Sequence, residues 1–127
     1  MTQKILQAQN IDFNRKAIES KKCEILAFPA KERGKDRPKQ LDSGIDQVVA
    51  AIAARNKIAI ALDIESLQQL NKEDKAKALA RFKQNIKLCR KAGTKVLIIN
   101  TEQKKEASAL LQSLGASSQQ AKEAISF

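Results

Sequence analysis

Four short runs of apolar residues recur along the chain and give the first structural signal. They lie at residues 4–8, 23–28, 58–64 and 95–100. The third and fourth runs, IAIALDI and KVLII, are apolar almost without a break, whereas a strand with one face in water alternates apolar and polar residues. Near-continuous runs are typical of parallel strands that are buried on both faces. We therefore predict four buried β-strands.

Helical signals fill the spaces between these runs. A short helix is predicted over about residues 13–20, with Asp12 as its N-cap. The longest helix is predicted over residues 72–92, between the N-cap Asn71 and Gly93, which ends it. The order of segments thus becomes strand and helix in alternation.

Three of the predicted helices have an apolar stripe at helical spacing. The stripes are Ile45, Val48, Val49 and Ile52 in the second helix, Ala76, Leu79, Phe82, Ile86 and Cys89 in the long helix, and Ala107, Leu110, Leu111 and Leu114 in the next one. Ser117 and Gln120 have the spacing of a capping box, which predicts a last short helix.

The fold class predicted is α/β, with four parallel strands joined by right-handed helical crossovers in a single domain, residues 1–127. A closed eight-stranded α/β barrel needs about 250 residues. The chain therefore suffices for a small open α/β sandwich or for half of a barrel. Both arrangements leave two sheet edges with little charge to protect them, so we expect a homodimer or pairing with a second chain.

The regular order is interrupted after the second strand, at residues 29–41. This segment lacks apolar periodicity, contains both prolines and follows a strand at the end where α/β folds place their sites. We predict a basic loop that binds phosphate groups; the alternative is a surface loop whose charges only favour solubility. Its cations are Lys31, Arg33, Lys35, Arg37 and Lys39.

The charge balance points to a polyanionic partner. Lysines and arginines number 24 against 14 acids, the net charge is +10, and histidine is absent. Without imidazole the chain lacks a histidine general base, a Ser-His-Asp triad and a His-ligated zinc. Four Phe with no Trp or Tyr also provide few stacking platforms for single-stranded bases. RNA binding would therefore depend on phosphate contacts and shape.

A second group of cations lies on the predicted long helix. Arg81 and Arg90 are taken from it as candidate RNA contacts, although a solvated helix face explains these charges equally well. The group consists of Lys75, Lys77, Arg81, Lys83, Lys87, Arg90 and Lys91.

Acids and thiols give weaker signals. Asp63, Glu65 and Glu102 follow strands and could in principle bind Mg²⁺, but they have no histidine partner, so we expect no metal bound by the protein. Cys23 and Cys89 lie in apolar segments and are predicted to be reduced core thiols. Reduced thiols, together with the absence of a secretory signal and of an apolar run long enough to span a membrane, predict a cytoplasmic protein without membrane contact.

Seven segments together carry a resemblance to a known family through their order and spacing. They are residues 14–19, 23–26, 42–47, 56–64, 85–93, 114–116 and 120–127. In this order they resemble the barrel-type protein subunit of archaeal and eukaryal ribonuclease P, which in archaea is component 3. No single segment is diagnostic. Members of the family have nearly twice this length, and the resemblance covers their C-terminal part.

The resemblance implies half of a TIM-like barrel related to PHP phosphoesterases. It also implies a place in the ribonucleoprotein that removes the 5′ leader from precursor tRNA. In that enzyme the RNA component performs the hydrolysis with Mg²⁺, and the protein binds no cofactor. The implied partners are ribonuclease P RNA, precursor tRNA and other protein subunits, notably a small ferredoxin-like one. Only the basic loop and Arg15 carry over as RNA-contact candidates.

The predicted function is thus an RNA-binding subunit of ribonuclease P that supports 5′ maturation of precursor tRNA as a scaffold, without catalysis of its own. Two alternatives remain open. One is a protein-interaction module whose basic charge is incidental. The other is a remnant of a metal-dependent phosphoesterase that uses Asp63, Glu65 and Glu102. Clustering of cations on one face would separate the first function from the interaction module.

Overall fold

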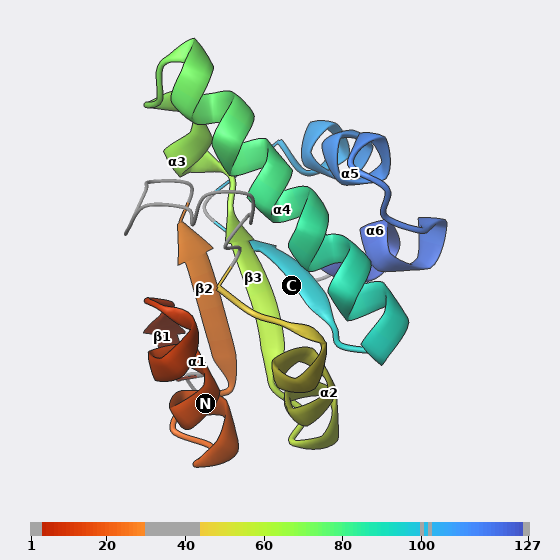
Figure 1. Cartoon of the computed structure of the whole chain (residues 1–127). Coiled ribbons are helices and arrows are strands. Elements are labelled where there is room, and N and C mark those ends of the chain that lie inside the picture. The colour runs from red at the N-terminus through yellow and green to blue at the C-terminus, as the bar shows by residue number, and fades with distance from the viewer. Residues whose placement is uncertain (1–3, 30–43, 100, 102, 126–127) are drawn as a thin grey trace.

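Four parallel strands form one sheet in the order β1-β2-β3-β4 (Figure 1). The computed structural model describes residues 4–29, 44–99, 101 and 103–125. Each strand pairs in parallel with the next one along the chain. The predicted α/β fold with four parallel strands is confirmed. The strands are β1 (Ile5–Gln7), β2 (Ile25–Pro29), β3 (Ala59–Asp63) and β4 (Val96–Ile99).

Helices occupy the connections between strands and the segment after β4. A single turn, α3, follows β3 and was not predicted, because four residues are too few to show helical periodicity. Within the residues described, no helix is both long and apolar enough to cross a membrane. The helices are α1 (Ile11–Glu19), α2 (Gln47–Arg55), α3 (Glu65–Gln68), α4 (Lys72–Ala92), α5 (Lys104–Ser113) and α6 (Ser118–Ala124).

The ends of the long helix and the start of the last one are as predicted. Asn71 caps α4 by accepting a hydrogen bond from a main-chain N–H of the first turn, and Gly93 ends it in the left-handed conformation with φ of 81°. At α6 the side chain of Ser117 accepts from the Gln120 N–H, and the Gln120 side chain accepts from the Ser117 N–H. Local sequence thus determines these three helix ends.

The predicted N-cap of α1 is wrong. Asn10 caps this helix through a 2.8 Å hydrogen bond from the Phe13 N–H to its Oδ1, and α1 begins at Ile11. Asp12 lies in the first turn, where a carboxylate is favoured by the N-terminal end of the helix dipole. Both side chains suit a helix start, and the extended backbone at Asn10 decides between them.

The buried faces of α2 and α4 differ from the predicted stripes. In the α2 stripe, Ile45 and Val49 are buried as predicted, but Val48 is 52% exposed, and α2 turns Ala50 and Ala53 inward beside Val49. On α4, Ala76 is exposed while Ala78 is buried. The two helices pack against each other in front of the sheet (Figure 1), and their buried alanines belong to one apolar cluster. Small side chains permit this close approach, and a pattern based on large apolar residues does not detect it.

The two faces of the sheet differ in what covers them. On the outer face, strand residues such as Leu26, Phe28 and Leu62 share one cluster with apolar residues of all six helices. On the inner face, a second cluster consists of strand residues only: Ile25, Ala27, Ala59, Ala61 and Leu97, with Ile99 packed beside them. The prediction of buried strands is confirmed for β2, β3 and β4 but is wrong for β1, whose Ile5 and Gln7 are exposed at the edge of the sheet. Every described helix packs on the outer side.

Candidate nucleic-acid interface

The predicted basic loop lies outside the described residues. Its cations Lys31, Arg33, Lys35, Arg37 and Lys39 therefore stay a prediction. The structure does show the residues on either side of this segment. The chain leaves the carboxyl end of β2 at Pro29 and is described again from Gly44, just before α2.

A buried asparagine anchors the chain at Gly44. The Asn14 side chain is fully buried in the second turn of α1. Its Nδ2 donates to the main-chain oxygens of Gly44 (2.8 Å) and Gln9 (3.0 Å), and its Oδ1 accepts from the Gln9 N–H (2.7 Å). Three hydrogen bonds satisfy the amide and offset the cost of burying it. The segment before α1 and the segment before α2 are thereby joined.

Gly44 is required at this point for two reasons. Its φ is +91°, and a Cβ added there would lie 2.8 Å from Cε2 of Phe28 and 3.0 Å from Nδ2 of Asn14. A side chain would therefore be strained in the backbone and would overlap the ring. Asn14 and Gly44 both lie in segments that resemble the family, but their spacing in the sequence does not predict that they meet. The available signal was Asn14 itself, a polar residue on the same side of the helix as the apolar residues Ala17 and Ile18.

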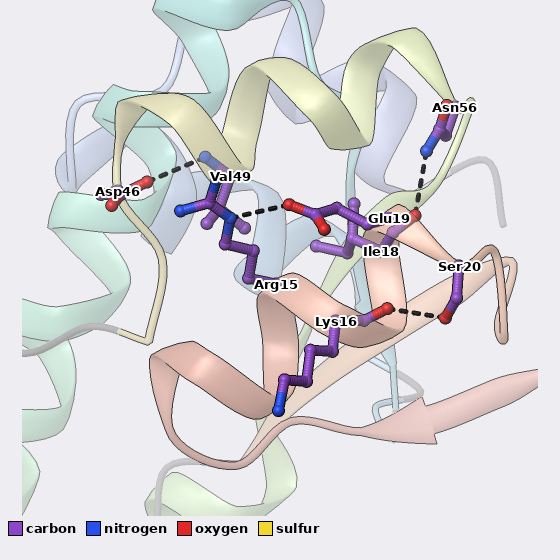
Figure 2. A network of polar contacts seen from close by, with 8 residues as sticks. All are labelled: Arg15, Lys16, Ile18, Glu19, Ser20, Asp46, Val49 and Asn56. Carbon is purple, nitrogen blue, oxygen red and sulfur yellow. Dashed lines mark hydrogen bonds and ion pairs between the residues drawn. The ribbon is translucent and has the colours of Figure 1, made fainter.

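Arg15, the candidate RNA contact on α1, is surrounded by acids (Figure 2). Its Nε donates to Oε1 of Glu19 at 2.7 Å. This hydrogen bond and the Glu19 charge raise the Arg15 pKa, with smaller contributions from Asp46 and Asp12. Asp46 is also the N-cap of α2, accepting from the Val49 N–H at 2.8 Å. An incoming phosphate would have to compete with Glu19 for this guanidinium.

Helix α4 carries its charge differently. Its two acids, Glu73 and Asp74, both lie in the first turn, and no acid follows before the helix ends. The seven predicted cations all lie after them. Six are exposed and Arg81 is half-buried. The ion pair Arg15–Glu19, by contrast, lies on α1.

Three α4 cations share one side of the helix. Lys83, Lys87 and Arg90 are exposed and follow one another at spacings of four and three residues, which places them on successive turns. Of these, only Arg90 was a candidate. Its Nη1 makes a long 3.4 Å hydrogen bond to the Gly115 oxygen, so this side of α4 borders the turn before α6. Arg81 lies elsewhere on the wheel, and the structure does not join it to these three residues.

Contact between α4 and α6 fixes this surface in place. The Gln120 side chain, besides capping α6, donates from Nε2 to the Ile86 oxygen at 3.2 Å. Lys83 and Lys87 flank Ile86 in the sequence, while Ile86 itself is buried. The cations thus project from a helix that is held on its inner side. Lys91 is also exposed and follows Lys87 by four residues, so it extends the same side of the helix. We call Lys83, Lys87, Arg90 and Lys91 the α4 basic face.

The candidate acids show no metal-binding geometry among the residues described. Oδ1 of Asp63 accepts from the Ser66 N–H at 3.3 Å, so this carboxylate is used in the turn into α3. Glu65 is exposed on α3, and Glu102 lies outside the described residues. Within the described part of the chain, no three His, Cys, Asp or Glu residues are grouped to hold a metal ion.

Both cysteines are free and buried, as predicted for core thiols. Burial raises the pKa of Cys89 to about 12, and a hydrogen bond with Thr94 opposes this only weakly. Burial also raises the pKa of Cys23. A thiol that keeps its proton is a poor nucleophile and metal ligand. The cysteines therefore serve packing.

Sequence comparison finds relatives of one kind. Ribonuclease P protein component 3 of Methanococcus vannielii is 30% identical over 93 residues, which is 73% of this chain and 37% of that protein. The component 3 of Methanocaldococcus jannaschii is 32% identical over 94 residues, covering 74% and 38%. That of Methanothermobacter thermautotrophicus is 33% identical over 89 residues, covering 70% and 34%. The match thus spans little more than a third of these relatives, and no family model matches the chain.

Structural comparison extends the similarity to nearly the whole chain. A chain of the cryo-EM structure of archaeal ribonuclease P with mature tRNA superposes with a TM-score of 0.77 at 25% sequence identity. The superposition covers 96% of this chain and 52% of that one. Four parallel strands that match about half of a longer chain agree with the predicted half of a barrel. In sequence and fold, this chain is similar to part of archaeal ribonuclease P protein component 3.

Proposed function

We propose that this chain is an RNA-binding protein subunit of ribonuclease P that supports 5′ maturation of precursor tRNA without cutting the RNA itself. Its similarity to component 3 supports membership of the complex. The α4 basic face is the observation that carries RNA binding, because its cations are exposed on a helix that has no acid after its first turn and can neutralise phosphates there. The predicted basic loop and Arg15 are further proposed contacts.

Phosphate contacts by the α4 basic face predict a defined salt dependence. Each phosphate that is neutralised contributes about −0.7 to −0.9 to the log–log slope of affinity against salt concentration. We expect the triple variant Lys83→Gln, Lys87→Gln and Lys91→Gln to flatten the slope for a structured precursor tRNA by roughly two units. Fluorescence anisotropy over a salt series measures this slope.

A matched variant tests whether position matters as well as charge. Lys21, Lys22 and Lys57 are also exposed and lie in turns away from α4. The triple change of these three to Gln removes the same charge and should leave the slope nearly unchanged. Equal flattening by both triple variants would mean that net charge alone attracts RNA. That result would favour the interaction module with incidental charge.

The basic loop is tested separately. Changing Lys31, Arg33, Lys35, Arg37 and Lys39 to Ala should flatten the slope by roughly two to four units while base preference stays similar. An unchanged slope would assign these charges to solubility.

Absence of catalysis by the isolated protein is a further part of the proposal. We expect no hydrolysis of phosphodiesters above background with Mg²⁺, Mn²⁺ or Zn²⁺, because histidine is absent and Asp63 is used in a turn. In the complex, Mg²⁺ would belong to the RNA component. Metal-dependent turnover that disappears in Asp63→Asn would instead support the phosphoesterase remnant.

The proposed partners follow from the same assignment. They are ribonuclease P RNA, precursor tRNA and other ribonuclease P proteins, notably a small ferredoxin-like subunit, in the cytoplasm. We also propose that a second chain pairs with the open sheet. Copurification from the native host, with identification of the bound RNA and proteins, tests this set. Recovery of the chain with none of these molecules would contradict the proposal.

A further inference from the structure

The α4 basic face contains a row of three lysines. Lys83, Lys87 and Lys91 follow one another at intervals of four residues, and all three side chains are exposed. Residues four apart form a continuous ridge along a helix, inclined by about 26° to its axis, with an axial rise of about 6 Å between successive members. A step of this length is comparable with the distance between neighbouring phosphates of one RNA strand. The row therefore suits three consecutive phosphates.

The part of α4 that leads up to this row carries small side chains. Ala76 and Ala80 are exposed, and they precede Lys83 by seven and three residues, which places all three on the same side of the helix. Methyl groups followed by lysines permit a rigid partner to lie close along the helix. Longer side chains at these two positions would hold such a partner away from the row.

Helix α4 presents the row on a rigid support. It has 21 residues and is capped at both ends, which gives a length of about 30 Å. Its inner side buries Phe82, Ile86 and Cys89 in the outer cluster. Gln120 of α6 also donates to the Ile86 oxygen, and Figure 1 shows α4 crossing in front of the sheet. The backbone positions of the three lysines are thus fixed before a partner binds.

Exposed aromatic side chains, on which unpaired bases stack, are absent from α4 and from the rest of the chain that the structure describes. Phe28 and Phe82 are buried, and the half-buried Phe13 lies on α1. Proteins that bind single-stranded RNA use aromatic side chains to hold the unstacked bases. Paired RNA keeps its bases stacked inside and is recognised through its phosphates and its shape. The α4 basic face has the groups for this second mode.

We propose that the α4 basic face binds double-stranded RNA in preference to single-stranded RNA, with Lys83, Lys87 and Lys91 on consecutive phosphates of one strand. This inference rests on the proposed RNA-binding function and specifies the form of RNA that the face accepts. A duplex already holds its phosphates in a fixed line. A single strand loses conformational freedom when it is drawn out along the row, and that loss weakens its binding.

Fluorescence anisotropy with one RNA sequence, used either alone as an unstructured strand or paired with its complement, provides the test. We expect the duplex to bind the wild-type chain about tenfold or more tightly than the single strand. Changing the three lysines of the row to Gln should reduce this preference to about twofold or less. The matched variant, in which Lys21, Lys22 and Lys57 become Gln, loses the same charge from other exposed positions and should keep the preference.

A second pair of variants tests the close approach along the helix. Ala80→Glu puts a longer side chain and a carboxylate beside the row and should weaken duplex binding by roughly five- to tenfold. Ala109→Glu adds the same charge at an exposed position of α5 and should weaken it by less than about twofold. Glu is a good helix former, so both helices should persist, and far-UV circular dichroism checks this. Equal weakening by the two variants would contradict a duplex lying along α4.

The outcomes separate this inference from the function on which it rests. A chain that binds neither RNA contradicts both. Equal binding of the two RNAs, weakened alike when the three lysines of the row are changed, would leave RNA binding by α4 intact and overturn the preference for a duplex. A duplex preference that survives this triple change also overturns the inference, because another surface would then recognise paired RNA.

Discussion

The outer and inner faces of the sheet are both apolar, yet they are built differently. The outer face presents large side chains, among them Phe28, Ile60 and Leu62, to a layer of six helices. The inner face has alanine at three of its central positions, and no described helix contributes to its cluster. The chain thus completes its outer layer by itself. The inner face has the small side chains that a narrow barrel interior accepts.

The largest expected effect on the free energy of unfolding comes from truncating one leucine on each face of the sheet. Leu62→Ala should lower the free energy of unfolding by about 3–5 kcal/mol, because Leu62 is fully enclosed by the helical layer. Leu97→Ala on the inner face should cost about 2 kcal/mol, at the low end for this substitution. Its cost should grow with protein concentration if a second copy covers that face. Urea unfolding at two concentrations measures both, and identical losses throughout would remove the distinction between the faces.

The next effect concerns the anchor that joins α1 to the chain before α2. Gly44→Ala should cost about 2–3 kcal/mol, since it adds steric overlap with Phe28 to an unfavourable positive φ. Gly93→Ala is the matched control. Gly93 has φ of +81° but nothing within 4 Å of an added Cβ, so only the backbone contribution of about 1 kcal/mol is expected. Equal losses in urea unfolding would show that the ring contact is unimportant.

A pH-dependent effect of about 1 kcal/mol is expected from the outer cluster. The Cys89 pKa is raised from 9.0 to about 12 in the folded chain. The unfolded state therefore loses this proton first, and the stabilisation present below pH 9 declines as pH rises toward 12. Between pH 9 and 10, wild type should lose about 1 kcal/mol more than Cys89→Ala. Parallel losses in urea unfolding would mean that the thiol ionises readily in the folded state.

The smallest effect is expected at Arg15, outside both faces. Its ion pair with Glu19 is exposed, so Arg15→Gln should leave the urea midpoint unchanged within error. Its effect on the salt slope of RNA binding should also be smaller than that of one lysine in the α4 basic face, because the Glu19 carboxylate beside its Nε already neutralises much of its charge. If Arg15→Gln flattened the salt slope of RNA binding by one full unit, Arg15 would be a direct phosphate contact.

Much of the local structure could be predicted because its causes are local. The run IAIALDI predicted β3, and the caps Asn71, Gly93, Ser117 and Gln120 predicted three helix ends. Asp12 was the wrong cap because two suitable residues stood two positions apart. In the second stripe only Val48 was placed wrongly, because α2 buries the small residues Ala50 and Ala53, which a pattern of large apolar residues does not detect.

The site was predictable only in part. Periodicity placed Arg81 and Arg90 on the long helix, but which cations share a side depends on how α4 is rotated against the sheet. In the structure α4 buries Ala78 and Asn85, which were not predicted to face inward, besides Phe82, Ile86 and Cys89. Likewise, the acids around Arg15 come partly from α2, which the chain order does not place beside α1. Charge counts therefore indicated a polyanionic partner without identifying the surface that meets it.

The sequence by itself determined the α/β order, the strand positions, the basic charge and the exclusion of histidine chemistry, because each depends on residue type or short-range spacing. Only the tertiary structure decided that all six described helices cover one face and that Asn14 and Gly44 meet across 30 residues. These features arise from packing between distant segments, where side-chain volume and hydrogen-bond direction, rather than local propensity, select the arrangement.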